Sequence, residues 1–178
     1  MAARVNDSKL LYEGRVFKLI RDTVTLENGV TTDLDIVRHP GASAMVPLYN
    51  EDTVLLLKQY RHAVGDFIWE VPAGTLGDGE GPCECAKREL IEETGFSAAK
   101  WEKLGEITPV PGYSDERIHI FLASDLSPAR QNLDPDEVLS IHKVKVDDVM
   151  EMVNTGQIQD CKTISSLFMA INRLKKTT

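Results

Sequence analysis

An acidic segment, residues 74–96, contains a helix signal with a clear start and a clear end. Pro82 suits the first turn of a helix, where its missing N–H removes no hydrogen bond. Gly95 suits the left-handed residue that commonly ends a helix. The sequence therefore predicts a helix from about Pro82 to Thr94.

Three glutamates crowd one face of this predicted helix. Glu89 lies four residues before Glu93 and three before Glu92, so their side chains occupy neighbouring rows. They repel one another, and the helix dipole disfavours Glu92 and Glu93 by a few tenths to about 1 kcal/mol each. Arg88 can offset one carboxylate, but clustered acids are better satisfied by divalent cations, and Mg²⁺ chooses oxygen ligands. The pattern favours a metal site over a solvated acidic helix face.

The whole segment resembles the signature of the Nudix hydrolases, G-x5-E-x7-R-E-U-x-E-E-x-G-U, where U is apolar. The matching positions are Gly74, Glu80, Arg88, Glu89, Leu90, Glu92, Glu93, Gly95 and Phe96. So many specified positions at fixed spacing leave little room for chance agreement.

The resemblance implies two to three Mg²⁺ or Mn²⁺ ions held against a substrate pyrophosphate. By position, Glu89 and Glu93 would be metal ligands, and Glu92 would be a further ligand, directly or through water. Arg88 would fix the orientation of a glutamate through a charge-assisted hydrogen bond. The backbone carbonyl of Ala73 would be an additional ligand, and Glu80 would support the loop before the helix.

Length and composition agree with a soluble enzyme of one domain, and the sequence favours a cytoplasmic location. The 178 residues are 42% apolar and 27% charged, an ordinary balance for one packed core. The net charge of −8 argues against nucleic-acid binding, and the sequence predicts no membrane span or secretion signal. Three cysteines, an odd number, favour a reducing compartment, and a C-x-C on a helix does not favour zinc.

Before the helix, the chain predicts two pairs of strands. Residues 16–27 and 30–39 are joined by Asn28-Gly29, which predicts a type I′ hairpin turn with positive φ at both residues. Residues 42–49 and 53–60 form the second pair. The apolar run VLLLK in the latter predicts a buried central strand.

After the helix, the pattern predicts three strands and two helices, at residues 101–108, 117–123, 138–146, 147–154 and 162–175. Gly156 would end the first of these helices. The last helix carries apolar residues at helical spacing, which predicts a face in the core. These residues are Ile164, Leu167, Phe168, Ile171 and Leu174.

These elements predict an α/β fold, and they agree with the Nudix α/β/α sandwich around a mixed central sheet. Residues 1–40 would form an N-terminal antiparallel β extension, and residues 41–178 the Nudix hydrolase domain. The resemblance implies that such an extension builds a homodimer.

Two flanking segments, residues 59–74 and 109–116, resemble the ADP-ribose pyrophosphatase and nucleoside-diphosphate-sugar hydrolase branch, whose marker proline would be Pro111. The resemblance spans about residues 8–175. It implies that Arg61 and Glu70 line the substrate cleft, although Arg61 could instead cap a strand end.

Three further residues are interpreted as substrate-binding, each with an alternative. Trp69 could stack on the substrate or pack in the core. Tyr113 could stack on a base, bond a sugar hydroxyl or only form a turn. Glu116 could bind sugar or metal-bound water, or be a solvated loop acid.

The resemblance to this branch implies a general base on a loop well after the signature, and the acidic stretch LDPDEV, residues 133–138, occupies that place. Glu137 is the first choice, with Asp134 and Asp136 as alternatives in the same loop. If the loop is only solvated, Glu92 could take the role.

The resulting hypothesis is a metal-dependent hydrolase of nucleoside diphosphate sugars, with ADP-ribose cleaved to AMP and ribose 5-phosphate. Alternatives are another sugar nucleotide such as GDP-mannose, a house-cleaning nucleoside triphosphate pyrophosphohydrolase, and a non-catalytic module that binds sugar nucleotides.

Overall fold

The computed structural model describes residues 3–176, which fall into two compact units. The first unit comprises Met1–Gly41 and Thr108–Arg117, and the second comprises Ala42–Ile107 and Ile118–Thr178. Each unit is described by itself below.

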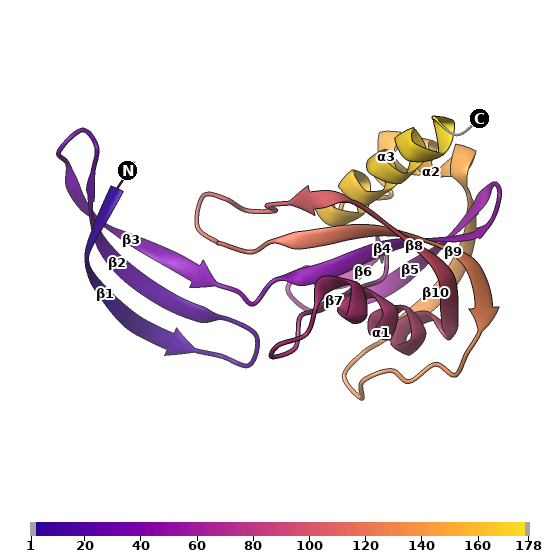
Figure 1. Ribbon diagram of the computed structural model, residues 1–178, viewed down its shortest axis with the longest axis horizontal. Helices are drawn as coiled ribbons and strands as arrows, with labels where there is room; N and C mark the ends of the chain where they lie inside the picture. The colour runs from indigo at the N-terminus through magenta and orange to yellow at the C-terminus, as the bar shows by residue number, and fades with distance from the viewer. Residues whose placement is uncertain (1–2, 177–178) are drawn as a thin grey trace. The chain divides into compact units, whose positions relative to one another are not determined.

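The first unit is a three-stranded antiparallel sheet in the order β1-β2-β3 (Figure 1). Its strands are β1 (Ala3–Glu13), β2 (Lys18–Leu26) and β3 (Thr31–Arg38). The hairpin of β2 and β3 agrees with the prediction. Strand β1 was not predicted, because its sequence lacks the apolar–polar alternation that marks a half-buried strand, and every residue in it is exposed.

The turn between β2 and β3 differs from the prediction. Gly29 has a φ of 83°, but Asn28 does not have positive φ, since Asp125 is the one non-glycine residue with positive φ in residues 3–176. The Gly29 N–H donates to the Leu26 carbonyl at 2.9 Å, and the Leu26 N–H donates to the Val30 carbonyl at 2.8 Å. The type I′ prediction is therefore wrong: one left-handed glycine closes a three-residue loop.

Residues 108–117 belong to the first unit because they attach to the end of β3. The Val37 N–H donates to the Tyr113 carbonyl at 2.7 Å, and the Asp115 N–H donates to the Val37 carbonyl at 3.2 Å. The carboxylate of Asp115 also accepts the His39 N–H at 2.9 Å and pairs with Arg38 at 3.1 Å.

The second unit is built on a mixed seven-stranded sheet. Its path is β10-β5-β4-β9-β8, with β6 beside β5 and β7 beside β4. Strands β4 and β9 are parallel, and the other pairs are antiparallel. The strands are β4 (Ala42–Asn50), β5 (Thr53–Arg61), β6 (Asp66–Glu70), β7 (Ala73–Thr75), β8 (Phe96–Ile107), β9 (Ile118–Pro128) and β10 (Leu139–Lys145).

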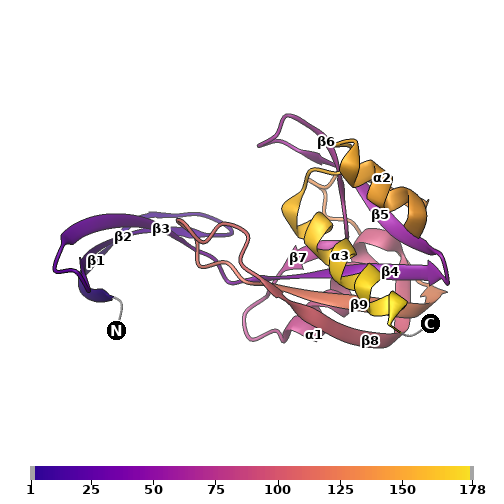
Figure 2. The same ribbon diagram turned by 90° about the horizontal axis from the view of Figure 1, so that it is seen from above.

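Three helices cover this sheet on both faces: α1 (Pro82–Thr94), α2 (Val146–Asn154) and α3 (Cys161–Lys175). Along β4, Val46 joins the core cluster that includes Leu167 of α3, whereas its neighbour Met45 joins the cluster that includes Leu90 of α1. Successive residues of a strand point to opposite faces, so α1 lies on one face and α3 on the other. Figures 1 and 2 show the same layers. The predicted α/β/α sandwich is confirmed.

The buried central strand is also confirmed, since Val54, Leu55, Leu56 and Leu57 of β5 are at most 2% exposed. The boundaries of α1 are confirmed as well. Its helix ends at Gly95, which has a φ of 67° and donates its N–H to the Ile91 carbonyl at 2.9 Å.

Some predicted details are wrong. Strand β8 begins at Phe96 rather than residue 101, β9 continues to Pro128 rather than residue 123, and the short strands β6 and β7 were not predicted. Phe168 is 62% exposed rather than in the core. Leu167, the residue before it, is buried against the sheet. Successive residues of a helix are about 100° apart around its axis, so the Phe168 side chain points away from the sheet. None of the helices in residues 3–176 is long and apolar enough to cross a membrane.

Candidate active site

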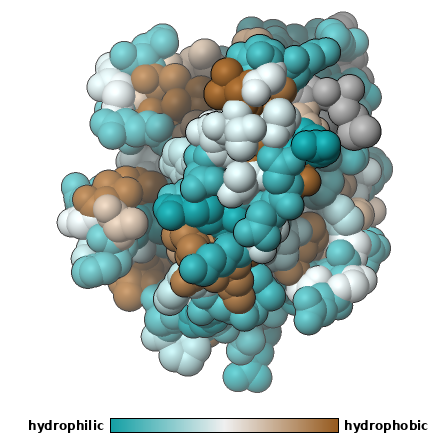
Figure 3. Space-filling model, turned by 90° about the vertical axis from the view of Figure 1, so that its left-hand side faces the viewer, coloured by the Kyte–Doolittle hydropathy of each residue, from teal (hydrophilic) through white to brown (hydrophobic). Residues whose placement is uncertain are grey.

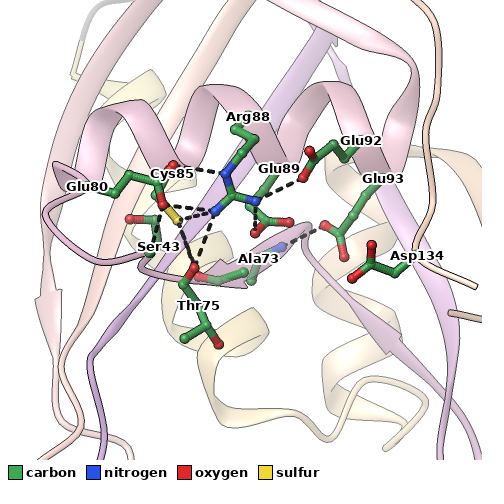
Figure 4. A network of polar contacts seen from close by, with 12 residues as sticks. Ser43, Ala73, Thr75, Glu80, Cys85, Arg88, Glu89, Glu92, Glu93 and Asp134 are labelled. Carbon is green, nitrogen blue, oxygen red and sulfur yellow. Dashed lines mark hydrogen bonds and ion pairs between the residues drawn. The ribbon is translucent and has the colours of Figure 1, made fainter. Parts of the chain in front are cut away.

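Arg88 is the centre of a carboxylate network on α1 (Figure 4). Its Nε and terminal amine bind both oxygens of Glu80, at 2.8 and 2.9 Å. Its other amine binds Glu89 at 2.5 Å and Glu92 at 2.9 Å. The sequence predicted that Arg88 would offset one carboxylate, and the structure shows that it contacts three.

Glu80 connects the loop before α1 to this network. Its second oxygen accepts the Gly77 N–H at 2.9 Å in addition to the bond from Arg88. Hydrogen bonds from Arg88, and then from Gly77, lower the pKa of Glu80 to about 2. Glu80 therefore remains charged over the ordinary pH range and holds the loop against the helix.

Glu93 is the most buried carboxylate of the site. The residue is 2% exposed, and its Oε2 accepts the Ala73 N–H at 2.9 Å (Figure 4). Burial, and then the charge of Glu89, raise the pKa of Glu93 well above its usual value, and the charge of Glu137 acts in the same direction. The Ala73 N–H and the charge of Lys162 oppose this rise.

Glu89 lies directly against the backbone of Gly74. A Cβ at Gly74 would fall 1.8 Å from Glu89 Oε1, so glycine is required for this approach. Burial raises the pKa of Glu89, and the charges of Glu92 and Glu137 add to that rise while Arg88 opposes it. Glu89 and Glu93 are thus a partly and a fully buried acid, and the charge of Glu89 disfavours the charged form of Glu93.

These carboxylates fit a hard divalent cation, although they are not preassembled around one. Within residues 3–176, no group of three or more His, Cys, Asp or Glu side chains is arranged to hold a metal. Arg88 partly explains why the carboxylates do not converge on a metal position, because it binds Glu89 and Glu92. The donor set still consists of carboxylate oxygens, which Mg²⁺ prefers, and a cation would relieve the repulsion between Glu89 and Glu93.

The loop that follows β9 is attached to the C-terminus of α1. Gln131 Nε2 donates to the Glu93 carbonyl at 2.6 Å, and the Asn132 N–H donates to the Glu92 carbonyl at 3.1 Å. The Ala129 N–H donates to the Gly95 carbonyl at 2.7 Å. These bonds satisfy carbonyls that a helix end leaves without intrahelical partners, and they fix the start of the acidic loop.

The same loop brings Glu137 near the buried acids, since its charge acts on both Glu89 and Glu93. The Asp134 N–H donates to Glu137 Oε2 at 3.0 Å, and the Glu137 N–H donates to the Asp134 carbonyl at 3.0 Å. These two bonds close a turn that restrains the Glu137 carboxylate. Asp134 and Asp136 are exposed, whereas Glu137 is half-buried.

Glu70 is held between two cations. Arg61 Nε donates to Glu70 Oε2 at 2.9 Å, and Lys162 Nζ donates to Glu70 Oε1 at 2.7 Å. Glu70 is 3% exposed, whereas the side chain of Arg61 is 41% exposed. The structure therefore brings Arg61 and Glu70 together, with Arg61 as the group that reaches solvent.

Lys162 was not predicted to be a site residue. Its position offered one signal, because it lies in the first turn of α3, where the helix dipole disfavours a cation. That position calls for nearby carboxylates, but Glu70 is 92 residues away in the chain, and no local pattern connects the two.

Trp69 lies on a different face from Glu70. The two residues are adjacent in β6, so their side chains point to opposite sides of the strand. Trp69 packs against the core cluster that includes residues of α2 and α3. Its ring lies edge-on to that of His142, with the ring centroids 4.8 Å apart. This environment favours the packing alternative for Trp69.

Tyr113 and Glu116 belong to the first unit. Tyr113 is 58% exposed, and its carbonyl binds β3 as described above. Glu116 Oε1 lies 3.6 Å from His39 Nδ1, and the Glu116 N–H donates to Ser114 Oγ at 3.2 Å. Their roles in substrate binding stay predictions.

Comparison with protein families decides what this site belongs to. The family profile described as the NUDIX domain matches residues 38–163. The chain belongs to the Nudix family. Arg88 and the glutamates Glu80, Glu89, Glu92 and Glu93 are therefore the charged positions of its Nudix signature, and the predicted family is confirmed.

Two relatives that match this Nudix protein over most of its length carry different names. It is 39% identical to the "Methanol dehydrogenase activator" of Bacillus methanolicus and 37% identical to the "ADP-ribose pyrophosphatase" of Bacillus subtilis (strain 168). Each match covers 86% of this chain and 84% of the relative.

A solved structure confirms the Nudix fold. The crystal structure of an "ADP compounds hydrolase" superposes with a TM-score of 0.88 over 99% of this chain and 96% of that chain, at 22% identity.

Proposed function

We propose that this Nudix protein hydrolyses the pyrophosphate bond of nucleoside diphosphate sugars, with ADP-ribose as the leading substrate and AMP and ribose 5-phosphate as products. The observation that carries this proposal is the carboxylate cluster of α1, in which Arg88 binds Glu89 and Glu92 while Glu93 is buried against the Ala73 N–H. The exposed guanidinium of Arg61, paired with Glu70, adds a candidate phosphate ligand. The ADP-ribose pyrophosphatase among the relatives supports the choice of substrate.

The cofactor in this proposal is Mg²⁺ or Mn²⁺, in two to three ions per site. Glu89, Glu93 and the Ala73 carbonyl would hold the ions, with Glu92 as a further ligand. When bound, the ions neutralise phosphate charge and lower the pKa of a water molecule. Arg88 orients Glu89 and Glu92 through charge-assisted hydrogen bonds, so the carboxylates are held before substrate arrives.

Glu137 would take the proton from the attacking water as general base. Its position in the loop attached to α1, and the effect of its charge on Glu89 and Glu93, support this role. Asp134, Asp136 and Glu92 remain alternatives, and Glu92 is occupied by Arg88 at 2.9 Å.

Substrate binding would depend first on Arg61, whose planar guanidinium matches phosphate oxygens. Glu70 would orient that guanidinium rather than contact the sugar, because both of its oxygens are bonded to cations. Tyr113 and Glu116 would bind the nucleoside or sugar, and Trp69 would do so only if its ring left the packing with His142.

The N-terminal extension, residues 1–40, would form a homodimer, with residues 41–178 as the hydrolase domain. Its exposed apolar side chains support this assignment, and brown apolar residues stand at the surface among teal polar ones in Figure 3. A cytoplasmic location is supported by three free cysteines, at positions 83, 85 and 161, because thiols persist in reducing compartments. The net charge of −8 favours a free nucleotide over a nucleic acid as ligand.

The test is phosphate-coupled turnover of ADP-ribose, GDP-mannose, UDP-glucose, NADH and ATP with Mg²⁺ or Mn²⁺. Wild type should cleave ADP-ribose best, and Glu93→Gln should lose about 100-fold or more, because a ligand supplies several kcal/mol of charge stabilisation. Glu84→Gln is the matched control, since Glu84 is an exposed acid on the same helix.

Each alternative has its own outcome in this assay. Preference for GDP-mannose would change the substrate but retain the reaction. Cleavage of ATP alone would replace the proposal with a nucleoside triphosphate hydrolase. Tight binding of ADP-ribose without turnover would indicate a binding module.

A further inference from the structure

Lys162 occupies a position that electrostatics makes unfavourable for a lysine. It lies in the first turn of α3, at the positive end of the helix dipole, and its side chain is only 12% exposed. A buried ammonium is tolerated when carboxylates pair with it. Lys162 therefore depends on its partners, and they depend on it.

Both partners of Lys162 are acidic and largely buried. Its Nζ donates to Glu70 Oε1 at 2.7 Å and to Asp160 Oδ2 at 2.8 Å. Asp160 is also the N-cap of α3, where it accepts the Thr163 N–H at 3.0 Å. The ammonium thus joins Glu70 of β6 to the start of α3.

Glu70, held by Lys162, in turn holds the side chain of Arg61. Its second oxygen accepts Arg61 Nε at 2.9 Å and lies 2.8 Å from a terminal amine of the same guanidinium. A guanidinium held through two nitrogens has a defined plane. Arg61 is the exposed end of the chain of contacts from Asp160 through Lys162 and Glu70.

A second contact, made by Thr163, joins the same segments. Thr163 Oγ1 accepts the Val71 N–H at 2.9 Å and donates to Asp160 Oδ2 at 2.5 Å. The bond from the Val71 N–H to Thr163 holds the backbone after Glu70 and does not involve Lys162, although Thr163 and Lys162 share Asp160 Oδ2 as an acceptor. Loss of the lysine should therefore free the Glu70 side chain while the backbone stays in place.

We propose that Lys162 is a positioning residue for substrate binding, which acts by holding Glu70 so that the Arg61 guanidinium stays oriented for a substrate phosphate. Lys162 does not touch the substrate itself, because its ammonium is buried and engaged by two carboxylates. This inference rests on the proposed role of Arg61 in the proposed hydrolase.

The experiment measures kcat and KM of the full chain for ADP-ribose with Mg²⁺. Lys162→Met should raise KM by about 10-fold to 100-fold and change kcat less, because the Arg61 contact would bind ground state and transition state alike. The charge of Lys162 also acts on Glu93, but less than burial or the charge of Glu89 does. Lys162→Arg should restore most of the affinity. Lys175→Met is the matched control, since it removes an exposed lysine of the same helix, and it should leave KM unchanged.

A double-mutant cycle with Arg61→Ala tests whether Lys162 acts through Arg61. In the Arg61→Ala background, Lys162→Met should raise KM less than twofold further. Full multiplication of the two effects would overturn the proposal. So would an unchanged KM with a lower kcat, which is the result of losing folded enzyme.

Asp160→Asn keeps the inference testable if Lys162→Met does not fold. Asparagine is also a good N-cap, so the helix start survives while the charge beside Lys162 is removed. KM should rise in the same direction as for Lys162→Met, and an unchanged KM would overturn the proposal. Failure of the proposed function is distinguishable, because the wild type would then not hydrolyse ADP-ribose at all.

Discussion

At the scale of single residues, the site is built by placing acids where burial opposes their charge. Glu93 and Glu89 both have a raised pKa, with burial as the first cause in each case. The chain compensates with single donors, such as the Ala73 N–H and Arg88. A site of this kind costs stability without a cation and gains stability with one.

Glu93→Gln should therefore stabilise the metal-free protein at pH 8, raising Tm by a few °C. Because the folded-state pKa of Glu93 is raised, the folded state binds more protons than the unfolded state. The stability of the wild type thus falls as pH rises from the usual glutamate pKa of about 4.3 towards the folded-state pKa. Differential scanning calorimetry from pH 4 to 8 with chelator checks this.

The effect of Mg²⁺ on Tm provides a second test of the same prediction. Added Mg²⁺ should raise the Tm of the wild type but not that of Glu93→Gln, and Glu84→Gln should behave as wild type. A Glu93→Gln protein that is less stable than wild type at pH 8 would contradict the proposed cost of this buried charge.

Gly74→Ala should inactivate the enzyme without unfolding it. A Cβ at Gly74 would lie 1.8 Å from Glu89 Oε1, so the end of the Glu89 side chain must move. That side chain is flexible, so stability should change little, but turnover should fall about 100-fold because a misplacement of about 1 Å has that effect. Thermal unfolding and turnover of ADP-ribose measure the two effects, and Gly112→Ala, where a Cβ meets nothing within 4 Å, is the control.

At the scale of elements, the loop before α1 is joined to the helix mainly by Glu80 and Arg88. Glu80→Gln should lower the free energy of unfolding by about 1–2 kcal/mol at pH 7. This is less than the full pKa shift implies, because the side chain of Arg88 is 37% exposed and solvent screens the pair.

The pH dependence identifies the cause of that loss. The folded-state pKa of Glu80 is lowered to about 2, so its contribution is present above the unfolded pKa of about 4.3 and is lost as pH falls through about 2. Urea unfolding of wild type and Glu80→Gln should differ at pH 7 and converge near pH 2. A difference that persists at pH 2 would show that the charged pair is not its source.

At the scale of the whole molecule, the first unit has little core of its own. Val24 is the one buried apolar residue of its strands β1 to β3, as far as residues 3–176 are described. Several apolar residues of the unit are exposed, including Val5, Leu10 and Tyr12 at 49–57%. A small sheet needs a covered hydrophobic face to be stable, which supports the proposal that a second copy covers it.

The wild type should therefore sediment as a dimer in analytical ultracentrifugation. Leu10→Glu should shift it to monomer, because burying an unpaired carboxylate at an interface is costly. Lys9→Glu, on the neighbouring exposed position of β1, should have a smaller effect and serves as the charge control. A monomeric wild type at micromolar concentration would contradict the proposal.

Features that depend on neighbouring residues could be predicted from the sequence. Pro82 and Gly95 delimit α1 because their backbone restrictions act within one or two residues, and the glutamate spacing follows from 3.6 residues per turn. The buried β5 could be recognised from its continuous apolar run. The positions of the signature were sufficient to identify the family.

Contacts between residues that are far apart in the chain could not be predicted in this way. Lys162 and Glu70 are 92 residues apart, and Gln131 reaches the Glu93 carbonyl from 38 residues away. Such contacts depend on how helices and loops pack against the sheet, and the spacing of residues within one element does not encode that packing. Phe168 and Asn28 show the same limit, because their environments depend on the contacts that α3 and the β2–β3 loop make rather than on their immediate sequence.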